Sequence, residues 1–365
     1  MKIGILTYHR AHNYGAMLQA YALRTYLHNQ GHNVEFIDYW PDSHNKQYTL
    51  FKPIRGKSLY FKILNIISDS VTLIRRTIRM NKFNNFRKKH LGINDSIKYT
   101  TNKEPIIERY DCVVVGSDQI WRTQEYEGKH VGIDPMYLCT NIPNTTRCIS
   151  YAASMGIISL TSEDEHVIRT SLKNFNTILV RENSLKQLVE SLGYSAHVVL
   201  DPTLLLTKQQ WNQLIPSHRY SQKPYVLFYE LMPSQEALAF AKKKALSLNC
   251  ELLIMDSIIH TLPRKNHISY ASPIEFMHAI RDAEYVIATS FHGTAFSIIF
   301  EKQFLTIGLK NNADRVITLL SHLGILEHYQ ENPVDCNDID YCEIKTRYNN
   351  LVTDSQQKLL TAIEQ

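Results

Sequence analysis

A five-residue polar segment, Ser290-Phe291-His292-Gly293-Thr294, combines the residue types and spacing best suited to chemistry in this sequence. It lies between an apolar run at 285–289, which predicts a buried strand, and an apolar run at 295–300, which predicts a helix. A helix that starts directly after a strand presents unpaired backbone N–H groups and its positive dipole end to an anion. His292 could donate a hydrogen bond to that anion or move a proton near neutral pH. The segment predicts an enzyme site for an anionic small molecule, with a tight turn capped by histidine as the alternative.

The loop at 8–15 follows a predicted first strand at 2–7 and is a second candidate. Asn13 can cap the next helix, and Gly15 allows a ligand to approach the backbone closely. Two histidines and an arginine in this loop suit an anionic or sugar ligand, whereas the alternative is a helix cap with exposed polar neighbours. The candidate binding residues are His9, Asn13, Tyr14 and Gly15.

Asp118 follows an unbroken apolar strand predicted at 111–115. A carboxylate at this position could act as a general base that deprotonates a sugar hydroxyl. Trp121, three residues later, could stack on a sugar ring. The alternative is that Asp118 caps the next segment and Trp121 belongs to the core.

Three further cations are candidates for contact with an anion. Arg181 ends a predicted strand, and its planar guanidinium suits a carboxylate or a phosphate. An ion pair with Glu182 is the alternative for Arg181. Lys310 and Arg315 flank the start of a predicted helix, where a solvated helix terminus is the alternative.

Strand and helix patterns alternate along the chain, which predicts parallel sheets in two doubly wound α/β domains. The predicted strands are 2–7, 34–38, 111–115, 148–152, 177–180, 197–200, 225–229, 251–255, 285–289 and 304–309. The predicted helices are 16–30, 184–192, 234–248, 273–283, 295–300, 314–323 and 346–363. A domain boundary is expected within 201–224, with Asp201 as a structural hinge or cap. Ligands bind at the carboxyl ends of such strands, so the candidate residues should line a cleft between the domains.

The net charge of +5 for 365 residues conceals a strongly basic segment at 51–90. This segment holds eleven Lys and Arg residues and one acid, Asp69, so it carries +10 and the rest of the chain −5. Its apolar residues recur at helical spacing: Tyr60, Ile63, Leu64, Ile67, Val71, Ile74 and Ile78. A basic amphipathic helix predicts contact with an anionic membrane surface, and a helix packed on its domain with a solvated rim is the alternative. Nucleic acid is not expected, because no binding module or aromatic–basic repeat accompanies the charge.

The six cysteines include no C-x-x-C pair, which favours a reduced, cytoplasmic chain over a disulfide framework or a zinc site. The apolar stretch at the N-terminus is too short for a signal peptide, and no run has membrane-spanning length. The Gly-x-Gly-x-x-Gly and Walker sequences are both absent, so neither a metal nor a bound cofactor is expected.

Taken together, these motifs resemble those of the polysaccharide pyruvyl transferase family. The resemblance extends in order over about residues 1–325. The segments that carry it are Thr7 with 13–16 and 18–23, 115–121, Arg181-Glu182 with Ser184, 201–203, and 290–293. The basic segment is not part of these motifs.

The resemblance implies a GT-B-like fold of two Rossmann-like domains, with a last helix that crosses back to the first domain. The domains would be 1–203, carrying the basic insert at about 52–90 and binding the acceptor, and 204–340, binding phosphoenolpyruvate. The crossing helix would be 341–365. The implied reaction moves the enolpyruvyl group of phosphoenolpyruvate, a co-substrate, onto two hydroxyls of a sugar in exopolysaccharide synthesis. It yields a cyclic ketal and phosphate.

In family terms Arg181 and His292 would contact phosphoenolpyruvate. The amides of Gly293 and Thr294 suit its phosphate and Arg181 its carboxylate, while His292 is the candidate acid or phosphate anchor and Asp118 the candidate base.

Two other functions remain open on the sequence alone. A glycosyltransferase of the same fold would bind a nucleotide sugar, with Glu275 or Asp282 available for the ribose hydroxyls. A sugar-binding protein without catalysis is the other alternative. A lipid-linked saccharide acceptor would explain the basic helix, and the protein would then work peripherally at the inner face of the plasma membrane.

Overall fold

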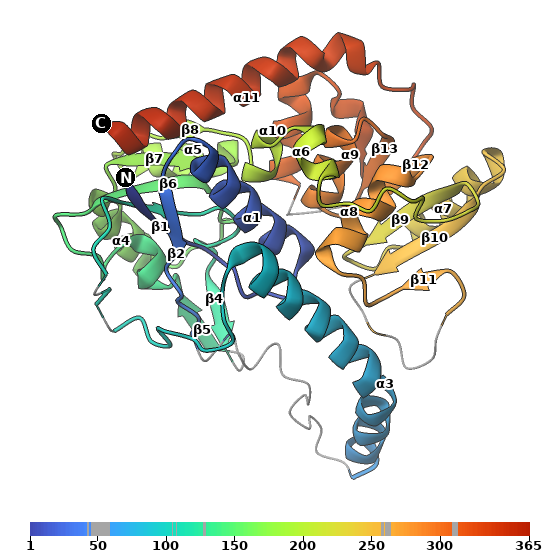
Figure 1. Cartoon of the computed structure of the whole chain (residues 1–365), viewed down its shortest axis with the longest axis horizontal. Coiled ribbons are helices and arrows are strands. Elements are labelled where there is room, and N and C mark those ends of the chain that lie inside the picture. The colour runs from blue at the N-terminus through green and yellow to red at the C-terminus, as the bar shows by residue number, and fades with distance from the viewer. Residues whose placement is uncertain are drawn as a thin grey trace.

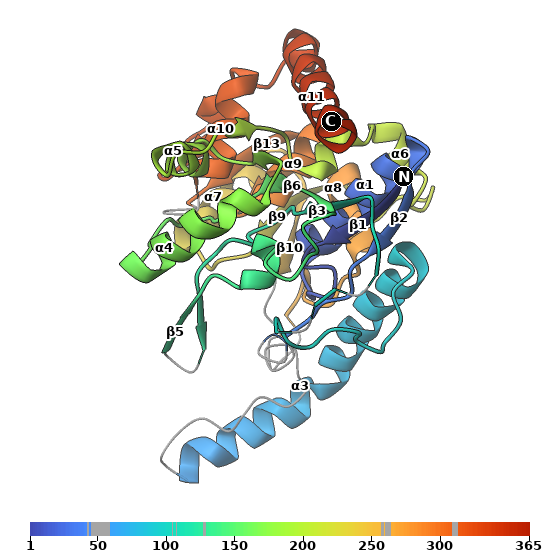
Figure 2. The same ribbon diagram turned by 90° about the vertical axis from the view of Figure 1, so that its left-hand side faces the viewer.

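The computed structural model describes residues 1–41, 44, 59–103, 105–106, 108–126, 129–256, 259, 264–308 and 313–365. Its two main sheets have six strands each, and every pair of neighbouring strands in them is parallel. Figures 1 and 2 show helices packed around both sheets. The predicted α/β fold of two Rossmann-like domains is confirmed.

The first sheet has the order β2-β1-β3-β6-β7-β8. Its strands are β1 Lys2–Leu6, β2 Asn33–Phe36, β3 Cys112–Val115, β6 Arg147–Ala153, β7 Thr177–Val180 and β8 His197–Val198. The order reverses between β1 and β3, as in flavodoxin-like sheets, and this reversal is where such folds bind ligands.

The second sheet has the order β11-β10-β9-β12-β13-β14. Its strands are β9 Tyr225–Glu230, β10 Glu251–Asp256, β11 His267–Ile268, β12 Tyr285–Ala288, β13 Gln303–Ile307 and β14 Tyr329–Gln330. This is the strand order of dinucleotide-binding Rossmann domains, and it reverses between β9 and β12. The middle strands β3 and β12 are buried throughout, because helices cover both faces of each sheet.

Ten α-helices are assigned in the described part of the chain. They are α1 Tyr14–Asn29, α3 Leu59–Phe86, α4 Ser162–Ser171, α5 Asn183–Ser191, α6 Lys208–Asn212, α7 Gln235–Ser247, α8 Pro273–Asp282, α9 Phe291–Ile299, α10 Asp314–Leu323 and α11 Tyr341–Glu364. A small antiparallel hairpin, β4 Gln124–Tyr126 and β5 Lys129–Gly132, stands beside the first sheet.

The last helix crosses from the second domain to the first, as predicted. At the start of α11, the Tyr341 hydroxyl donates to the Lys302 carbonyl at 2.5 Å. Further along, the Ser355 hydroxyl accepts the N–H of Leu200 at 3.0 Å, and Ile363 is fully buried. Figure 1 shows α11 in red, running across the top of the molecule so that the two chain ends lie close together.

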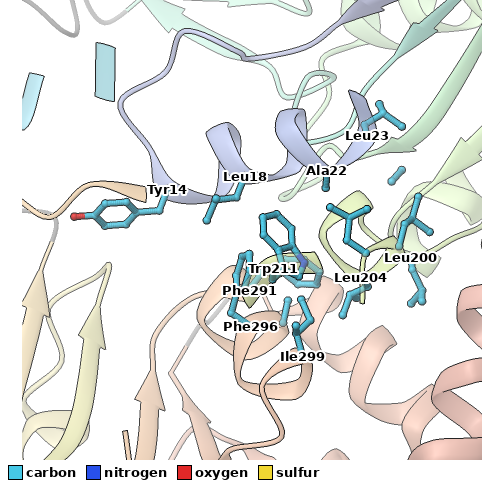
Figure 3. Packing of buried hydrophobic residues seen from close by; sticks show 14 of the residues in the cluster. Tyr14, Leu18, Ala22, Leu23, Leu200, Leu204, Trp211, Phe291, Phe296 and Ile299 are labelled. Atoms are coloured by element: carbon cyan, nitrogen blue, oxygen red, sulfur yellow. The ribbon is translucent and has the colours of Figure 1, made fainter. Parts of the chain in front are cut away.

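One hydrophobic core spans both domains. Trp211 lies at its centre, fully buried, with its indole N–H donated to the Thr203 carbonyl at 3.0 Å. Its ring contacts Tyr21 of α1 on one side and Phe296 of α9 on the other. Figure 3 shows side chains from α1, from the segment around Leu200 and Leu204, and from α9 meeting there. Apolar packing therefore holds the two domains together.

Several elements differ from the prediction. The basic helix α3 begins at Leu59 and is followed by one π-helical turn, Arg87–Leu91, while residues 52–58 lie outside the described part. The final helix begins five residues earlier than the predicted 346, because Asp340 caps it by accepting the N–H groups of Cys342 and Glu343. The β4–β5 hairpin, α4, α6, β11 and β14 were not predicted, since short or polar segments give a weak apolar pattern.

Candidate active site

A cleft of about 710 Å³ lies between the two domains, where the strand order of each sheet reverses. It is lined by the loops that follow β1 and β3 on the first domain, and by those that follow β9 and β12 on the second. The predicted residues that line it are Asn13, Gly15 and Asp118 from the first domain, and His292 and Arg315 from the second. The sheet topology thus gathers residues that are far apart in the sequence.

His292 is held at the start of α9 and faces the first domain. Ser290 caps this helix, because its hydroxyl accepts the Gly293 N–H at 2.9 Å. The imidazole is nearly buried, with 12% of the side chain exposed, and it packs directly against Gly15 at the start of α1. A side chain at position 15 would overlap the imidazole ring, so only glycine leaves room for it.

The amides of Gly293 and Thr294 do not face the cleft with free N–H groups, which corrects the prediction for both residues. The Gly293 N–H is taken by the capping hydroxyl of Ser290, and the Thr294 N–H donates to the Ser290 carbonyl at 3.2 Å. Both residues are buried. The N–H groups of Phe291 and His292, in the first turn of α9, have no acceptor within the helix and are the ones available to an anion.

Asp201 joins His292 to Arg181 in a buried charged cluster. One oxygen of the Asp201 carboxylate lies 2.5 Å from an Arg181 guanidinium nitrogen and 3.7 Å from His292 Nε2. The same oxygen accepts the Ser117 hydroxyl, and the other accepts the N–H and hydroxyl of Thr203. Burial would raise the pKa of the Asp201 carboxyl, but His292 and Arg181 hold it well below its usual range. Asp201 is therefore ionised in the folded protein and orients the side chains of Arg181 and His292.

Two guanidinium groups lie against the ring of Phe291. The central carbon of Arg181 is 5.0 Å from the ring centroid, and that of Arg315 is 5.8 Å from it. Desolvation and repulsion from Arg181 lower the pKa of Arg315 to about 10. Nε of each arginine, Nη2 of Arg181 and Nε2 of His292 are buried without a hydrogen-bond partner. Buried donors without partners are costly, so an anion that accepts from them would be stabilised here.

Arg181 is the least accessible of these cations. Its side chain is 1% exposed, and it borders a smaller cavity of about 160 Å³ under α11 rather than the main cleft. Arg315, at the start of α10, lines both cavities. Of these two arginines, Arg315 is therefore the one that lines the main cleft, while Arg181 lies outside its lining.

Asp118 is presented to the cleft from the opposite side. Its backbone has a φ of 77°, a left-handed conformation that aspartate and asparagine tolerate better than most residues. Gln19 fixes the loop, because its amide donates to the Thr7 hydroxyl and accepts the Ser117 N–H. A carboxylate oxygen of Asp118 lies 3.7 Å from the Arg181 guanidinium. Asp118 thus lines the cleft close to Arg181, and its role as a base stays a prediction.

His9 and Tyr14 do not line the cleft, which corrects their assignment as binding residues. His9 is fully buried, with its ring nitrogens 2.8 Å from the Thr7 carbonyl and 3.0 Å from Asp38. Burial lowers the pKa of His9. The Tyr14 ring stacks on Phe276 of the second domain, with centroids 4.8 Å apart. Both side chains are buried against residues from other segments, and the loop sequence alone does not show these contacts.

Two more predicted residues lie elsewhere. Trp121 is fully buried and donates its indole N–H to the Tyr137 carbonyl, so it belongs to the core and does not stack on a ligand. Lys310 lies outside the described residues. Asn13 lines the cleft, and its side-chain oxygen caps α1 by accepting the Ala16 N–H at 3.1 Å.

The sequence reasoning missed an aromatic group on the first-domain side of the cleft. Tyr8, Trp40 and His44 line the cleft and contact one another edge to face. Tyr8 comes two residues after β1 ends, and Trp40 comes four residues after β2 ends. The sequence did contain a signal for this group, because both residues follow strands that are neighbours in the first sheet. Aromatic faces and edges of this kind suit the apolar side of a sugar ring.

The carboxylates considered for a nucleotide ribose are engaged elsewhere. Glu275 accepts from Lys82 Nζ with both oxygens, at 2.7 and 2.8 Å. Asp282 is bonded to Arg281 and to the N–H of Tyr220. Neither residue lines the cleft.

Within the described segments, no cluster of His, Cys, Asp or Glu has an arrangement that could hold a metal ion. All six cysteines are unbridged. None of the helices described is both long and apolar enough to span a membrane.

Comparison with solved structures shows similarity only at low identity. The glycosyltransferase SnogD from Streptomyces nogalater is 12% identical, with a TM-score of 0.40 and coverage of 100% of this chain and 99% of that one. The UDP-GlcNAc 2-epimerase from Neisseria meningitidis is 8% identical, with a TM-score of 0.47 and 99% coverage of both chains. The UDP-GlcNAc 2-epimerase from Methanocaldococcus jannaschii is 10% identical, with a TM-score of 0.45 and 99% coverage of both. The fold assignment rests on the strand orders described above.

No curated protein matches the chain. The family model for polysaccharide pyruvyl transferase matches residues 13–311, which is most of the chain and includes both sides of the cleft. The chain therefore belongs to the polysaccharide pyruvyl transferase family.

Proposed function

We propose that this protein transfers the enolpyruvyl group of phosphoenolpyruvate onto two hydroxyls of a saccharide, forming a cyclic pyruvate ketal and releasing phosphate. One observation carries the proposal: buried nitrogen atoms of Arg181, Arg315 and His292 that lack a hydrogen-bond partner lie close to the carboxylate of Asp118 at the cleft. Phosphoenolpyruvate carries a phosphate and a carboxylate, and it would satisfy several of these donors at once.

The proposed reaction proceeds in two additions. In the first, a sugar hydroxyl loses its proton to Asp118 and attacks C2 of phosphoenolpyruvate, while C3 gains a proton and becomes a methyl group. The C2–O bond to phosphate then breaks and leaves an oxocarbenium-like centre. A second hydroxyl attacks this centre and loses its proton, which completes the ketal. The two hydroxyl protons balance the one gained by C3 and the one that leaves with phosphate.

The protein's contribution is to bind, orient and move protons. Arg315 and the first-turn N–H groups of α9 would donate hydrogen bonds to the anionic oxygens of phosphoenolpyruvate, and the charge of Arg181 would stabilise this anion from behind Arg315. His292, oriented by Asp201 and Gly15, is the proton donor in this scheme. Asp118 is the base for the first hydroxyl; once it has passed that proton on toward His292 or the departing phosphate, its carboxylate also stabilises the oxocarbenium-like centre.

The saccharide would enter from the first-domain side, against Tyr8, Trp40 and Asn13. The proposal includes a cytoplasmic location, a role in cell-surface or exopolysaccharide synthesis, and no bound cofactor. A lipid-linked saccharide is the acceptor that would connect this chemistry with the basic helix. Nucleic acid has no part in the proposal.

The test is thermal unfolding of the purified protein with phosphoenolpyruvate, beside a panel of nucleotides and nucleotide sugars. A ligand at about one hundred times its dissociation constant stabilises a protein by about 2.7 kcal/mol, which is readily measured. We expect phosphoenolpyruvate alone to stabilise the wild type, and the shift to be lost in Arg315→Met. Arg169→Met, on the exposed face of α4, is the matched control that should keep the shift.

Other outcomes decide between the remaining functions. Stabilisation by nucleotide sugars only would replace the proposal with a glycosyltransferase. If phosphoenolpyruvate binds, phosphate release in the presence of saccharide acceptors should be abolished by His292→Ala in a folded protein. Release that persists in this variant would remove His292 from the chemistry. A sugar-binding role is supported if saccharides bind while phosphate is never released.

A further inference from the structure

A second hollow adjoins the candidate active site, and the proposed chemistry does not use it. This hairpin groove has a volume of about 580 Å³ and is lined by the β4–β5 hairpin, the start of α4 and the segment at 100–102, all from the first domain. Gln124 of β4 and His130 of β5 line both the groove and the main cleft. Tyr39 lines the groove, and the next residue, Trp40, lines the cleft. The hairpin groove therefore meets the main cleft at its first-domain wall.

The hairpin groove differs from the main cleft in charge. Its described lining residues include three carboxylates, Asp134, Glu163 and Asp164, and neither lysine nor arginine. Burial would raise the pKa of the Asp164 carboxyl, but hydrogen bonds from Thr161 and His130 lower it. Ionised carboxylates repel other anions. The groove is therefore unfavourable for a phosphate, a nucleotide or a uronic acid.

The polar groups of the hairpin groove suit hydroxyl groups. The Tyr39 hydroxyl donates to one oxygen of Asp134 at 2.6 Å, and Asn102 Nδ2 donates to the other at 3.3 Å. Among the described residues, the side-chain oxygen of Asn102 and the exposed carboxylate of Glu163 have no hydrogen-bond partner. Both can accept from a hydroxyl. Val131, 61% exposed, adds an apolar surface for the C–H face of a sugar ring.

The junction between the groove and the cleft holds an unsatisfied donor. Gln124 Oε1 lies 3.2 Å from His44 Nε2, whereas the Gln124 amide nitrogen is buried and has no hydrogen-bond partner. A buried donor without a partner is costly, so a ligand oxygen that accepts from it would be stabilised. A molecule that extends from the cleft into the groove would bring its oxygens next to this nitrogen.

We infer that the hairpin groove binds a second, uncharged sugar unit of the acceptor, next to the unit that reacts in the cleft. The inference rests on the proposed function and deepens it, because it makes the acceptor a chain of at least two sugar units. Recognition in the groove is by hydroxyl groups, since its carboxylates repel anions. A phosphate or uronic acid elsewhere in the acceptor therefore lies outside the groove.

The experiment measures binding of the full chain to a glycan array. The printed probes are galactose, glucose and mannose, the di- and trisaccharides of each, and disaccharides in which either unit is replaced by its uronic acid. We expect at least one neutral disaccharide to bind at least about tenfold more tightly than its monosaccharide, because added hydrogen bonds stabilise the complex. One of its two uronic acid forms should bind no better than the monosaccharide. The inference is overturned if no neutral chain exceeds its monosaccharide, or if both uronic acid forms bind as tightly as the neutral disaccharide.

The groove is tested on its own with Asn102→Ala, Glu163→Ala, because these two residues line the groove and not the cleft. Asn350→Ala, Glu165→Ala, at exposed positions of α11 and α4, is the matched control. The groove variant should reduce the advantage of the disaccharide over the monosaccharide to about threefold or less. Its binding of monosaccharide and its unfolding temperature should stay near those of the wild type. An unchanged advantage in the groove variant, or an equal loss in the control, would contradict the inference.

Binding of phosphoenolpyruvate distinguishes this inference from the proposed function. Both double variants keep the cleft, so phosphoenolpyruvate should stabilise them as it stabilises the wild type. Stabilisation by phosphoenolpyruvate without any preference for a longer saccharide would contradict the groove assignment alone. Tighter binding of neutral disaccharides without stabilisation by phosphoenolpyruvate would support the groove as a saccharide site and contradict the proposed reaction.

Discussion

At the scale of single residues, both walls of the cleft carry ionisable side chains. The first domain contributes the carboxylate of Asp118, and the second contributes His292 and Arg315. Asp201, expected from the sequence to be a hinge or cap, does cap the turn at Pro202–Leu205 and also orients His292 and Arg181. A single buried carboxylate therefore serves both the domain junction and the candidate site.

Asp118→Asn should lower kcat by about a hundredfold to ten-thousandfold, the usual contribution of a general base. Asparagine has the same shape and tolerates the φ of 77°, so the fold and the binding of phosphoenolpyruvate should be nearly unchanged. Steady-state kinetics with thermal unfolding would check both expectations. Asp354→Asn, on the half-exposed surface of α11, serves as the control. Wild-type turnover in Asp118→Asn would show that another group removes the proton.

Gly15→Ala should displace the His292 ring, because a methyl group at position 15 would overlap it. Overpacking of this kind costs about 1–3 kcal/mol, and turnover should fall at least about tenfold as His292 moves. In the His292→Ala background the same substitution should cost almost no stability. A double-mutant cycle measures this coupling. Equal costs in both backgrounds would mean that the clash is relieved without moving His292.

At the scale of elements, we expect the contact between α1 and α3 to weaken in acid. His12, just before α1, lies 5.5 Å from the ring of Phe83. Burial, together with Arg79 and Arg87, lowers the pKa of His12 to about 4. An unfolded histidine has a pKa near 6.5, so the unfolded chain binds more protons than the folded chain between these values.

Lowering the pH from about 6.5 to about 4 should therefore destabilise the protein, and His12→Asn should reduce that loss by roughly 2 kcal/mol. Thermal unfolding of both proteins across this interval is the measurement. Asp201, whose pKa is lowered by His292 and Arg181 against burial, stabilises the fold above the unfolded aspartate pKa. That contribution is lost only at lower pH. Identical pH profiles for wild type and variant would show that His12 is not responsible.

At the scale of the whole molecule, the domains share one core and one crossing helix. Tyr14 and Leu18 of α1 belong to the same buried cluster as Phe276 and Phe296 of the second domain. Ile363 of α11 is also part of this cluster. Such a contact is more apolar than a flexible domain junction would be. The cleft is therefore bounded by two sheets that are held together behind it.

The protein should unfold in one cooperative transition, because neither domain can open without exposing this shared core. Differential scanning calorimetry would check this cooperativity through the ratio of van't Hoff to calorimetric enthalpy, which is expected to be near one.

Removal of α11 by ending the chain at residue 340 should abolish stable folding of the first domain, since Leu359 and Ile363 are fully buried there. Two resolved transitions in the full chain would contradict the shared core.

The sequence by itself determined the alternation of strands and helices, and with it the places where polar loops end the strands. That information is local, because apolar period and turn residues fix each βαβ unit. It was enough to predict the two sheets, the crossing helix through a family resemblance, and the presence of Asn13, Gly15, Asp118, His292 and Arg315 on one cleft.

Only the tertiary structure decided which hydrogen-bond donors already have acceptors and which aromatic rings are already packed against other side chains. Ser290 occupies the Gly293 N–H, Asp38 holds His9, and Phe276 covers Tyr14, so these residues leave the candidate site. Conversely, packing brought Asp201 to His292 and turned Tyr8 and Trp40 toward the cleft. Burial and hydrogen-bond partners depend on segments far apart in the chain, and no local pattern encodes them.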